Sequence, residues 1–229
     1  MTVEVQYPGR ASLMSALAEK VAEELQVALD AAGRATLAVP GGTTPAPFFE
    51  ILRKAPLDWS KVIVLLTDER FVPESSDRSN TRLLKEALLR DKAAAASLVP
   101  FYQIADQPED VLDHIRAGLD AALPIDVCVL GMGVDMHTAS LFPGADLLEE
   151  ALSMTAPIIL PMRAPGAPEP RLTLTAPALL GARKIHVLIT GEEKKHALAL
   201  AMSDLDAIAD APVRLILRDG AEVTVHYAD

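Results

Sequence analysis

Short, mostly apolar runs recur along this chain, and they limit its possible folds more than any other feature. Residues 61–66 read KVIVLL and residues 125–130 read IDVCVL. Runs of about four to eight aliphatic and β-branched residues are typical of strands that are buried on both faces of a sheet. Residues 35–39 and 184–190 have a similar character, so the sequence predicts several buried strands.

Segments with helical periodicity alternate with these strands. Between residues 12 and 31, an apolar residue recurs at every fourth position, which places the set on one face of a helix: Leu13, Leu17, Val21, Leu25 and Leu29. Further helices are predicted at residues 48–54, 83–88, 111–122 and 191–202, and further strands at residues 153–160, 172–175, 215–217 and 223–226. The polar segment 67–79 and the proline-rich segment 161–170 are predicted to be loops.

The alternation of buried strands and helices predicts an α/β fold, with a Rossmann-like, mainly parallel sheet and helices on both faces. The sequence contains no internal repeat and no linker long enough to mark a boundary. We therefore expect a single domain across residues 1–229.

The charge balance excludes several functions. The formal net charge is −11, and such an acidic surface repels nucleic acid. No apolar stretch is long enough to span a bilayer, and residues 1–7 lack the pattern of a signal peptide, so we expect a cytoplasmic protein with no membrane partner. Cys128 is the one cysteine, which rules out an intrachain disulfide. An anionic ligand would require a local cluster of arginine and lysine.

Three loops that follow predicted strands are candidate binding loops, because ligands of open α/β sheets bind beyond the carboxyl ends of the strands. The first loop contains Gly41, Gly42, Thr43 and Thr44. Paired glycines allow the backbone to approach a ligand, the threonines add hydroxyl groups, and the following helix N-terminus favours an anion. A plain tight turn is the equally simple alternative.

The second loop places three adjacent charges, Asp68, Glu69 and Arg70, directly after a buried strand. Buried charges are costly unless they are solvated or paired. Arg70 is suited to hold a phosphate through two parallel hydrogen bonds, and Asp68 to orient it or to meet a sugar hydroxyl. The alternative is a solvated loop with an internal ion pair.

The third loop begins with Gly131 and Gly133 and contains Asp135 and His137. Met136 replaces the third glycine of a dinucleotide-binding motif, so a nicotinamide cofactor is not expected. The ordinary pKa of histidine suits proton transfer near neutral pH, which makes His137 the best general acid or base in the chain, with Asp135 to fix its tautomer or to orient a water molecule.

Other chemistries at this loop have weaker support. A nucleophilic triad would use Ser140, but the chain lacks the G-x-S-x-G turn that exposes such a serine. Asp135 and His137 alone make a weak metal site, so no metal is expected. Arg171 and Lys194 are additional cations for an anionic ligand, although a lone lysine at a helix start is usually exposed to solvent.

These segments together resemble the 6-phosphogluconolactonase family. The matching motifs lie in the family's order and extend over most of the chain: PGGTTP (40–45), TDERFVPESSDRSN (67–80), GMGVDMHTASLFPG (131–144), RLTLT (171–175) and TGEEK (190–194). The resemblance implies a single α/β domain that hydrolyses 6-phospho-D-glucono-1,5-lactone to 6-phospho-D-gluconate in the oxidative pentose phosphate pathway, without a cofactor. It leaves the oligomeric state open, as a monomer or small homo-oligomer.

The resemblance also implies roles for individual residues. His137 would be the general base, with Asp135 in support. Arg70, Arg171 and Lys194 would bind phosphate or developing negative charge. The remaining substrate-binding residues implied by the matching motifs are Gly41, Gly42, Thr43, Thr44, Asp68, Asn80, Gly131 and Gly133. The family usually has glycine where this chain has Met136, and methionine is strained if that position requires a positive φ angle.

Two alternative functions differ in class. The related glucosamine-6-phosphate deaminases carry an acidic residue five positions after the histidine, where this chain has Phe142, and a tyrosine where it has Arg70. Both differences favour a lactonase over a deaminase or isomerase. A non-catalytic sugar-phosphate sensor, of the kind that is fused to transcription factors, is less consistent with the acidic charge.

Overall fold

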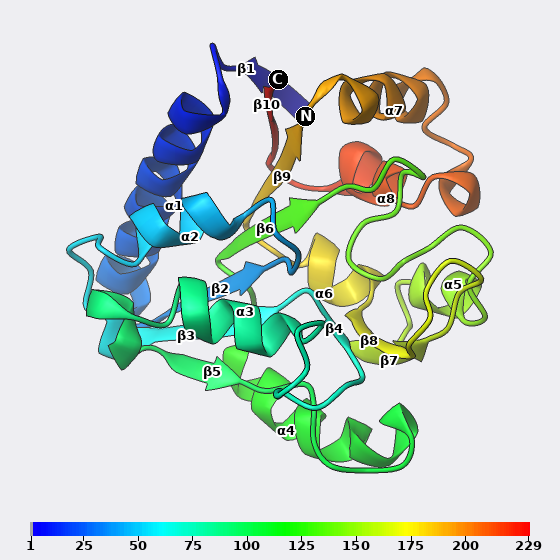
Figure 1. Cartoon of the computed structure of the whole chain (residues 1–229), viewed down its shortest axis with the longest axis horizontal. Helices are drawn as coiled ribbons and strands as arrows, with labels where there is room; N and C mark the ends of the chain where they lie inside the picture. Colours follow the sequence, from blue (N-terminus) through cyan, green and yellow to red (C-terminus); the bar gives the residue numbers. More distant parts are fainter. Residues whose placement is uncertain (1) are drawn as a thin grey trace.

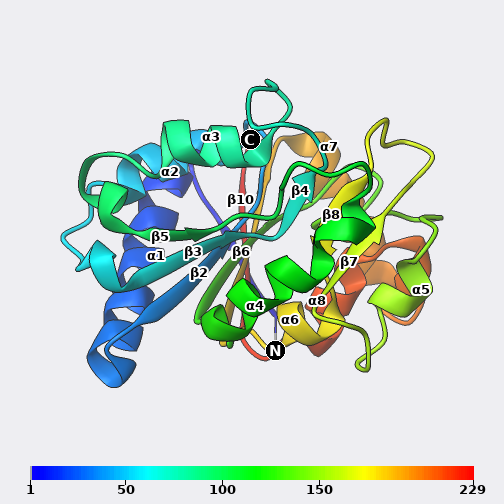
Figure 2. The ribbon, with the colours of Figure 1, turned by 90° about the horizontal axis from the view of Figure 1, so that it is seen from below.

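A computed structural model describes residues 2–229, whose strands form two sheets (Figures 1 and 2). The seven-stranded sheet is parallel throughout, in the order β1-β10-β9-β6-β2-β3-β5. Its strands are β1 (Thr2–Gln6), β2 (Ala35–Val39), β3 (Val62–Leu66), β5 (Ser97–Val99), β6 (Val127–Gly131), β9 (Lys184–Thr190) and β10 (Val223–Ala228). The three-stranded sheet is antiparallel, in the order β4-β8-β7, with β4 (Asp68–Arg70), β7 (Ile159–Met162) and β8 (Arg171–Leu174).

Helices cover both faces of the larger sheet (Figure 1). One face carries α1 (Arg10–Ala32), α2 (Ala46–Leu52) and α3 (Asn80–Ala87). The other carries α4 (Leu112–Ala122), α5 (Leu148–Ala151), α6 (Ala176–Leu180), α7 (Glu192–Ser203) and α8 (Val213–Asp219). Short 3₁₀ turns occupy Trp59–Lys61, Asp91–Ala95, Pro108–Val111 and Ile208–Asp210. Across residues 2–229, every helix is too short or too polar to cross a membrane.

The apolar runs of the sequence divide between two cores. In β3, Val64 and Leu66 pack toward α1, whereas Leu65 packs toward the opposite face. In β6, Val129 and Leu130 alternate in the same way. Successive side chains of a strand point to opposite faces, so a sheet between two helical layers requires apolar residues at nearly every position. The predicted α/β fold with a mainly parallel sheet is therefore confirmed.

Two predicted strands are wrong in type or position. Residues 215–217 lie in α8, which begins after Pro212, and residues 213–217 are all buried. An apolar run that is buried on every side has no periodicity to separate a helix from a strand. The strand predicted at residues 153–160 begins only at Ile159 and extends into the supposed proline loop. Pro161 is tolerated there because β7 is an edge strand, where a missing N–H group is harmless.

The sequence patterns do not predict three of the strands, namely β1, β4 and β5. Strands β1 and β5 form the two edges of the larger sheet, and β4 has only three residues, which are all charged. Edge strands and short strands bury few side chains, so they leave little hydrophobic pattern in a sequence. The predicted polar loop 67–79 thus contains a strand, and β4 brings its charges against β8.

Candidate active site

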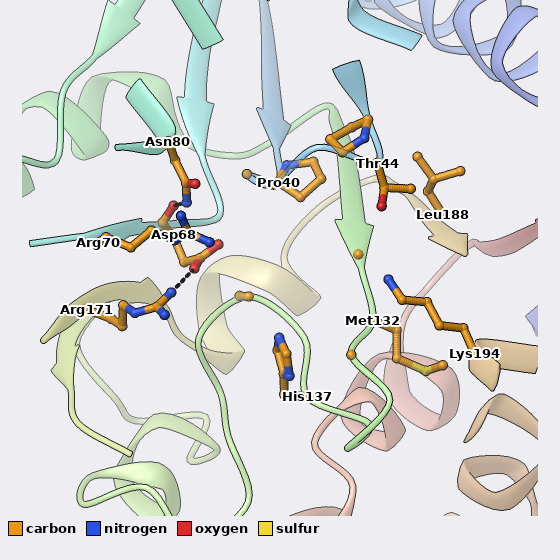
Figure 3. A pocket seen from close by; sticks show the side chains of 16 residues that line it. Pro40, Thr44, Asp68, Arg70, Asn80, Met132, His137, Arg171, Leu188 and Lys194 are labelled. Carbon is orange, nitrogen blue, oxygen red and sulfur yellow. Dashed lines mark hydrogen bonds and ion pairs between the residues drawn. The ribbon is translucent and has the colours of Figure 1, made fainter. Parts of the chain in front are cut away.

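The three candidate loops meet around one cavity at the carboxyl edge of the larger sheet (Figure 3). Its volume is about 200 Å³. The lining residues are Pro40, Gly41, Gly42, Thr44, Pro45, Asp68, Arg70, Asn80, Gly131, Met132, Gly133, His137, Ala139, Arg171, Leu188 and Lys194. Of the predicted site residues, Thr43 and Asp135 lie outside this lining. Thr43 lines a neighbouring groove between α1 and α2, and Asp135 is the hydrogen-bond partner of His137.

The loop after β6 is folded tightly around the imidazole of His137. The N–H group of Gly133 donates to the His137 carbonyl, and that of Met136 donates to the Gly133 carbonyl, both over 3.0 Å. A Cβ atom on Gly133 would lie only 2.3 Å from His137 Nδ1 and from Asp135 Oδ1. Glycine is therefore required at position 133 because the catalytic candidate occupies the space of a side chain.

Position 136 does require a positive φ angle. Met136 adopts the left-handed conformation there, with a φ angle of 62°. This conformation costs a non-glycine residue about 1–2 kcal/mol. Two contacts offset that cost: the Met136 carbonyl accepts a hydrogen bond from the Val213 N–H group over 3.0 Å, and its side chain packs against the core. The loop accordingly keeps His137 directed into the cavity without a glycine at position 136.

His137 and Asp135 form a directed pair. His137 Nδ1 lies 2.5 Å from Asp135 Oδ1, and the His137 backbone N–H group donates to the same oxygen over 3.3 Å. Burial opposes ionisation of Asp135, but the hydrogen bonds and charge of His137 outweigh it and hold the pKa of Asp135 below its ordinary value. An ionised Asp135 keeps the hydrogen on Nδ1, which leaves Nε2 as the acceptor that is free to take a proton.

Two arginines lie side by side on another wall of the cavity, and we call them the arginine pair. Arg70 of β4 and Arg171 of β8 are partners in the antiparallel register. Burial, followed by the charge of Arg70, lowers the pKa of Arg171, although the nearby Asp68 opposes the shift. The Nε atoms of both arginines are buried without a hydrogen-bond partner within residues 2–229. Such unsatisfied donors favour an anionic ligand.

Asp68 links the arginine pair to the histidine loop. Its Oδ2 atom lies 3.8 Å from Arg171 Nη1 and accepts a hydrogen bond from Ser140 Oγ over 2.6 Å (Figure 3 shows the contact with Arg171). Ser140 is completely buried. It therefore anchors the loop and is not an exposed nucleophile, in agreement with the missing nucleophile turn.

Glu69 has a structural role that the sequence did not reveal. Its carboxylate is completely buried and accepts hydrogen bonds from the backbone N–H groups of Arg70, Asn80 and Thr81, over 2.7–2.8 Å. Burial raises the pKa of Glu69 despite these bonds. The interpretation of residues 68–70 as a solvated loop with an internal ion pair is thus wrong, because Glu69 binds the first N–H groups of α3.

Asn80 reaches the cavity through the same arrangement. Its side-chain amide donates to the Asp68 carbonyl over 2.9 Å. A Cβ atom on Gly41 would lie 2.0 Å from Asn80 Cγ, so the glycine loop after β2 packs directly on this amide. Gly41 therefore permits close contact between two loops. A plain tight turn would not require that contact.

Lys194 lies in the first turn of α7 and faces the cavity from the side opposite the arginine pair (Figure 3). It is half-buried, and burial alone lowers its pKa. The expectation for a lone lysine, exposure to solvent, does not hold here. The cavity therefore has cationic groups on both sides of His137.

Sequence reasoning missed the apolar part of the lining. Met132 and Leu188 contribute side chains, and Pro40, Pro45 and Ala139 complete the wall. Leu188 was detectable in principle, because it lies near the carboxyl end of β9 and all carboxyl ends of a parallel sheet meet at one edge. Among residues 2–229, the structure contains no group of three or more histidine, cysteine, aspartate or glutamate side chains with the geometry to hold a metal ion.

A histidine with one free nitrogen, placed between cationic groups at the carboxyl edge of a parallel sheet, defines an α/β protein that acts on a small anion. Comparison with known proteins agrees with this class and narrows it. Residues 8–225 match the family described as glucosamine-6-phosphate isomerases/6-phosphogluconolactonase. The chain belongs to this family.

Individual relatives are similar over nearly their whole length. The chain is 49% identical over 213 residues to a 6-phosphogluconolactonase of Rhizobium meliloti, which covers 92% of this chain and 91% of that protein. It is 38% identical to one from Neisseria meningitidis serogroup A over all of both chains. The crystal structure of a 6-phosphogluconolactonase from Shewanella baltica matches with a TM-score of 0.96 at 35% identity, over 100% of this chain and 98% of that one.

Proposed function

We propose that this protein is a carboxylic ester hydrolase that converts 6-phospho-D-glucono-1,5-lactone to 6-phospho-D-gluconate. The observation that carries the proposal is the geometry of His137: Nδ1 is bound to Asp135, while the ring lines a cavity that also contains Arg70, Arg171 and Lys194. Hydrolysis of a phosphorylated lactone requires a base that deprotonates water and cations that bind the negative charge of the substrate. The relatives that are named 6-phosphogluconolactonases support the same activity.

In the proposed reaction His137 acts as a general base and then as a general acid. Nε2 removes a proton from a water molecule while the oxygen of that water attacks the lactone carbonyl carbon. The tetrahedral intermediate then collapses, the bond from the carbonyl carbon to the ring oxygen breaks, and the imidazolium returns its proton to that oxygen. Asp135 holds the imidazole in the required tautomer and stabilises the imidazolium, because its carboxylate remains ionised.

The cations on the two sides of His137 have complementary tasks in this proposal. Negative charge is present throughout on the phosphate, and a further charge develops on the carbonyl oxygen during attack. Arg70, Arg171 and Lys194, together with the loop from Gly41 to Thr44, bind these two charges. Binding of the distant phosphate holds the carbonyl carbon near the water and contributes to catalysis by positioning.

The proposal places the protein in the oxidative pentose phosphate pathway. We further predict that it is cytoplasmic and a monomer or small homo-oligomer. Cell fractionation and sedimentation velocity measure these two properties.

Release of acid from freshly generated lactone tests the activity. The lactone also hydrolyses unaided, so the rate is read after subtraction of the spontaneous reaction. We expect a rate that is proportional to protein concentration. A rate equal to the spontaneous one contradicts the proposal, and release of ammonia from glucosamine 6-phosphate would assign the site to deaminase chemistry instead.

A further inference from the structure

Phe142 contacts two residues of the cavity although it does not line the cavity itself. Its ring centroid lies 4.3 Å from that of His137, with the two planes at 38°. The guanidinium carbon of Arg171 lies 5.6 Å from the centroid of the same ring. Phe142 is half-buried and belongs to the loop that carries His137, five residues further along the chain. One aromatic side chain thus touches both the general base and one arginine of the arginine pair.

The contact with Phe142 adds to the hydrogen bond that holds the His137 ring. Its hydrogen bond to Asp135 holds one edge of the ring, and Asp135 itself is half exposed to solvent. A single bond at one edge still permits the ring to tilt, which would move Nε2 away from the attacking water. The Phe142 ring opposes that tilt, because aromatic rings at this distance have preferred relative geometries.

Arg171 is held in an unusual way for a buried cation. Its ion pair with Asp68 is long, at 3.8 Å, and its Nε atom has no hydrogen-bond partner within residues 2–229. The aromatic ring attracts the guanidinium without using any of its N–H groups. Contact with Phe142 therefore places Arg171 while leaving its donors available to an anion.

The same ring also addresses a charge problem in the reaction. When His137 takes a proton it becomes a second cation beside the Phe142 ring that Arg171 also contacts, and two cations in a partly buried site repel each other. The negative face of an aromatic ring attracts a cation that lies over it, as the Arg171 guanidinium does over Phe142, and this attraction offsets part of the repulsion. Leucine would fill similar space but would not supply this attraction.

We propose that Phe142 is a positioning residue whose ring orients His137 and Arg171 together. This role rests on the proposed lactonase activity. Phe142→Leu removes the ring and keeps an apolar side chain, whereas Phe142→Tyr retains the ring. We expect kcat for 6-phosphogluconolactone to fall about 10–100-fold in Phe142→Leu and to stay within about threefold of the parent in Phe142→Tyr. Tyr102→Leu is the matched control, because Tyr102 contacts only the ring of Phe71 among aromatic residues in the described part of the chain.

A measurement that is independent of turnover accompanies the kinetics. In the parent protein we expect the Nδ1 hydrogen of His137 to give a resolved NMR signal that Phe142→Tyr preserves and Phe142→Leu loses through faster exchange with water. Melting temperatures of all variants report on folding. Unchanged kcat and an unchanged His137 signal in a folded Phe142→Leu protein would overturn the inference, and so would equal losses in the leucine and tyrosine variants.

Failure of the proposed function would look different. If the parent protein does not hydrolyse the lactone, the proposed activity is wrong, and the NMR comparison still decides whether Phe142 orients His137. If the parent is active and Phe142→Leu matches it in both measurements, only the role of Phe142 is wrong.

Discussion

Two histidine–carboxylate pairs in this molecule have nearly the same bond and different surroundings. His137 Nδ1 lies 2.5 Å from Asp135 Oδ1, and His186 Nε2 lies 2.7 Å from Glu24 Oε2. The side chains of the first pair are 29% and 50% exposed, whereas those of the second are 3% and 10% exposed. The first lies at the cavity, and the second lies between β9 and α1.

The remaining ring nitrogen distinguishes the two pairs. The Glu24 carboxylate can only accept, so His186 Nε2 donates to it and Nδ1 is the acceptor of the neutral His186 ring. His226 Nε2 then donates to His186 Nδ1 over 3.0 Å, Tyr7 Oη donates to His226 Nδ1 over 2.9 Å, and every ring nitrogen in the series is occupied. His137 keeps one nitrogen for a ligand. Pairing with a carboxylate thus identifies a candidate base only when the other nitrogen faces open space.

The largest effect that separates the pairs is expected from removal of each imidazole. His137→Gln should lower kcat for 6-phosphogluconolactone by about 10²–10⁴-fold, because general acid–base catalysis is lost. His186→Gln should leave kcat within about twofold and lower the free energy of unfolding by about 1–3 kcal/mol, because a buried hydrogen-bonded group loses its partners. Steady-state kinetics and urea titration measure the two quantities. Near-normal turnover in His137→Gln would remove this residue from the mechanism.

Replacement of each carboxylate gives a smaller contrast. Asp135→Asn should lower kcat by about 10–100-fold, less than the loss known for a buried triad aspartate, because Asp135 is half exposed and water can partly replace it. Glu24→Gln should leave kcat unchanged and reduce stability. A kcat for Asp135→Asn equal to that of the parent would show that the tautomer of His137 is fixed by other contacts.

Acid should destabilise the protein through His226, which contacts His186 of the buried pair. Burial, aided by the charge of His186, lowers the pKa of His226 to about 3, while an unfolded histidine titrates near its ordinary value of about 6.5. Between these values the unfolded chain binds more protons, so the free energy of unfolding falls as pH falls, by about 2 kcal/mol from pH 7 to pH 5. Urea titrations across this range measure it, and His226→Gln should show a flatter dependence. An equally steep dependence in His226→Gln would assign the effect to other groups.

Glu24 acts in the same direction at lower pH. Burial opposes its ionisation, but the hydrogen bond and charge of His186 and the nearby Lys20 lower its pKa overall. A depressed carboxylate pKa gives stability that is present above the ordinary value and is lost as pH falls toward the folded value. Glu24→Gln should therefore reduce the acid sensitivity that remains in His226→Gln.

The smallest effect is expected at Met136, the strained residue between the proposed base His137 and its partner Asp135. Met136→Gly relieves the left-handed conformation but removes a side chain that packs on the core, so stability should change by less than about 1 kcal/mol. Because glycine accepts the same φ angle, kcat should remain within about threefold of the parent. A large loss of kcat would show that the methionine side chain, beyond its backbone, supports the histidine.

Sequence reasoning predicted the elements that fill the cores. Strands β2 and β9 have the predicted bounds, and α1 extends the predicted helix by two residues at its start and one at its end. Their side chains repeat with a period that burial enforces. Prediction from the sequence failed for β1 and β5 at the sheet edges and for α8, because the periodic pattern of apolar residues is weak or ambiguous there.

At the site, sequence reasoning named most of the lining residues but not their arrangement. His137, Arg70, Arg171 and Lys194 share one cavity, as expected, although they lie far apart along the chain. Thr43 faces a different groove, and Glu69, from the middle of the most charged motif, is a buried helix cap. A charged side chain gives the same signal in a sequence whether it binds a ligand or satisfies the backbone.

By itself the sequence determined a parallel α/β sheet, because only strands that are buried on both faces require such continuous apolar runs. It also determined the position of a histidine in a glycine loop that follows one of these strands. What only the tertiary structure decided is which nitrogen of which histidine is free. That property depends on partners from distant segments: Glu24 and His226 for His186, and an open cavity for His137. Chain folding brings those partners together, and no local pattern of residues records them.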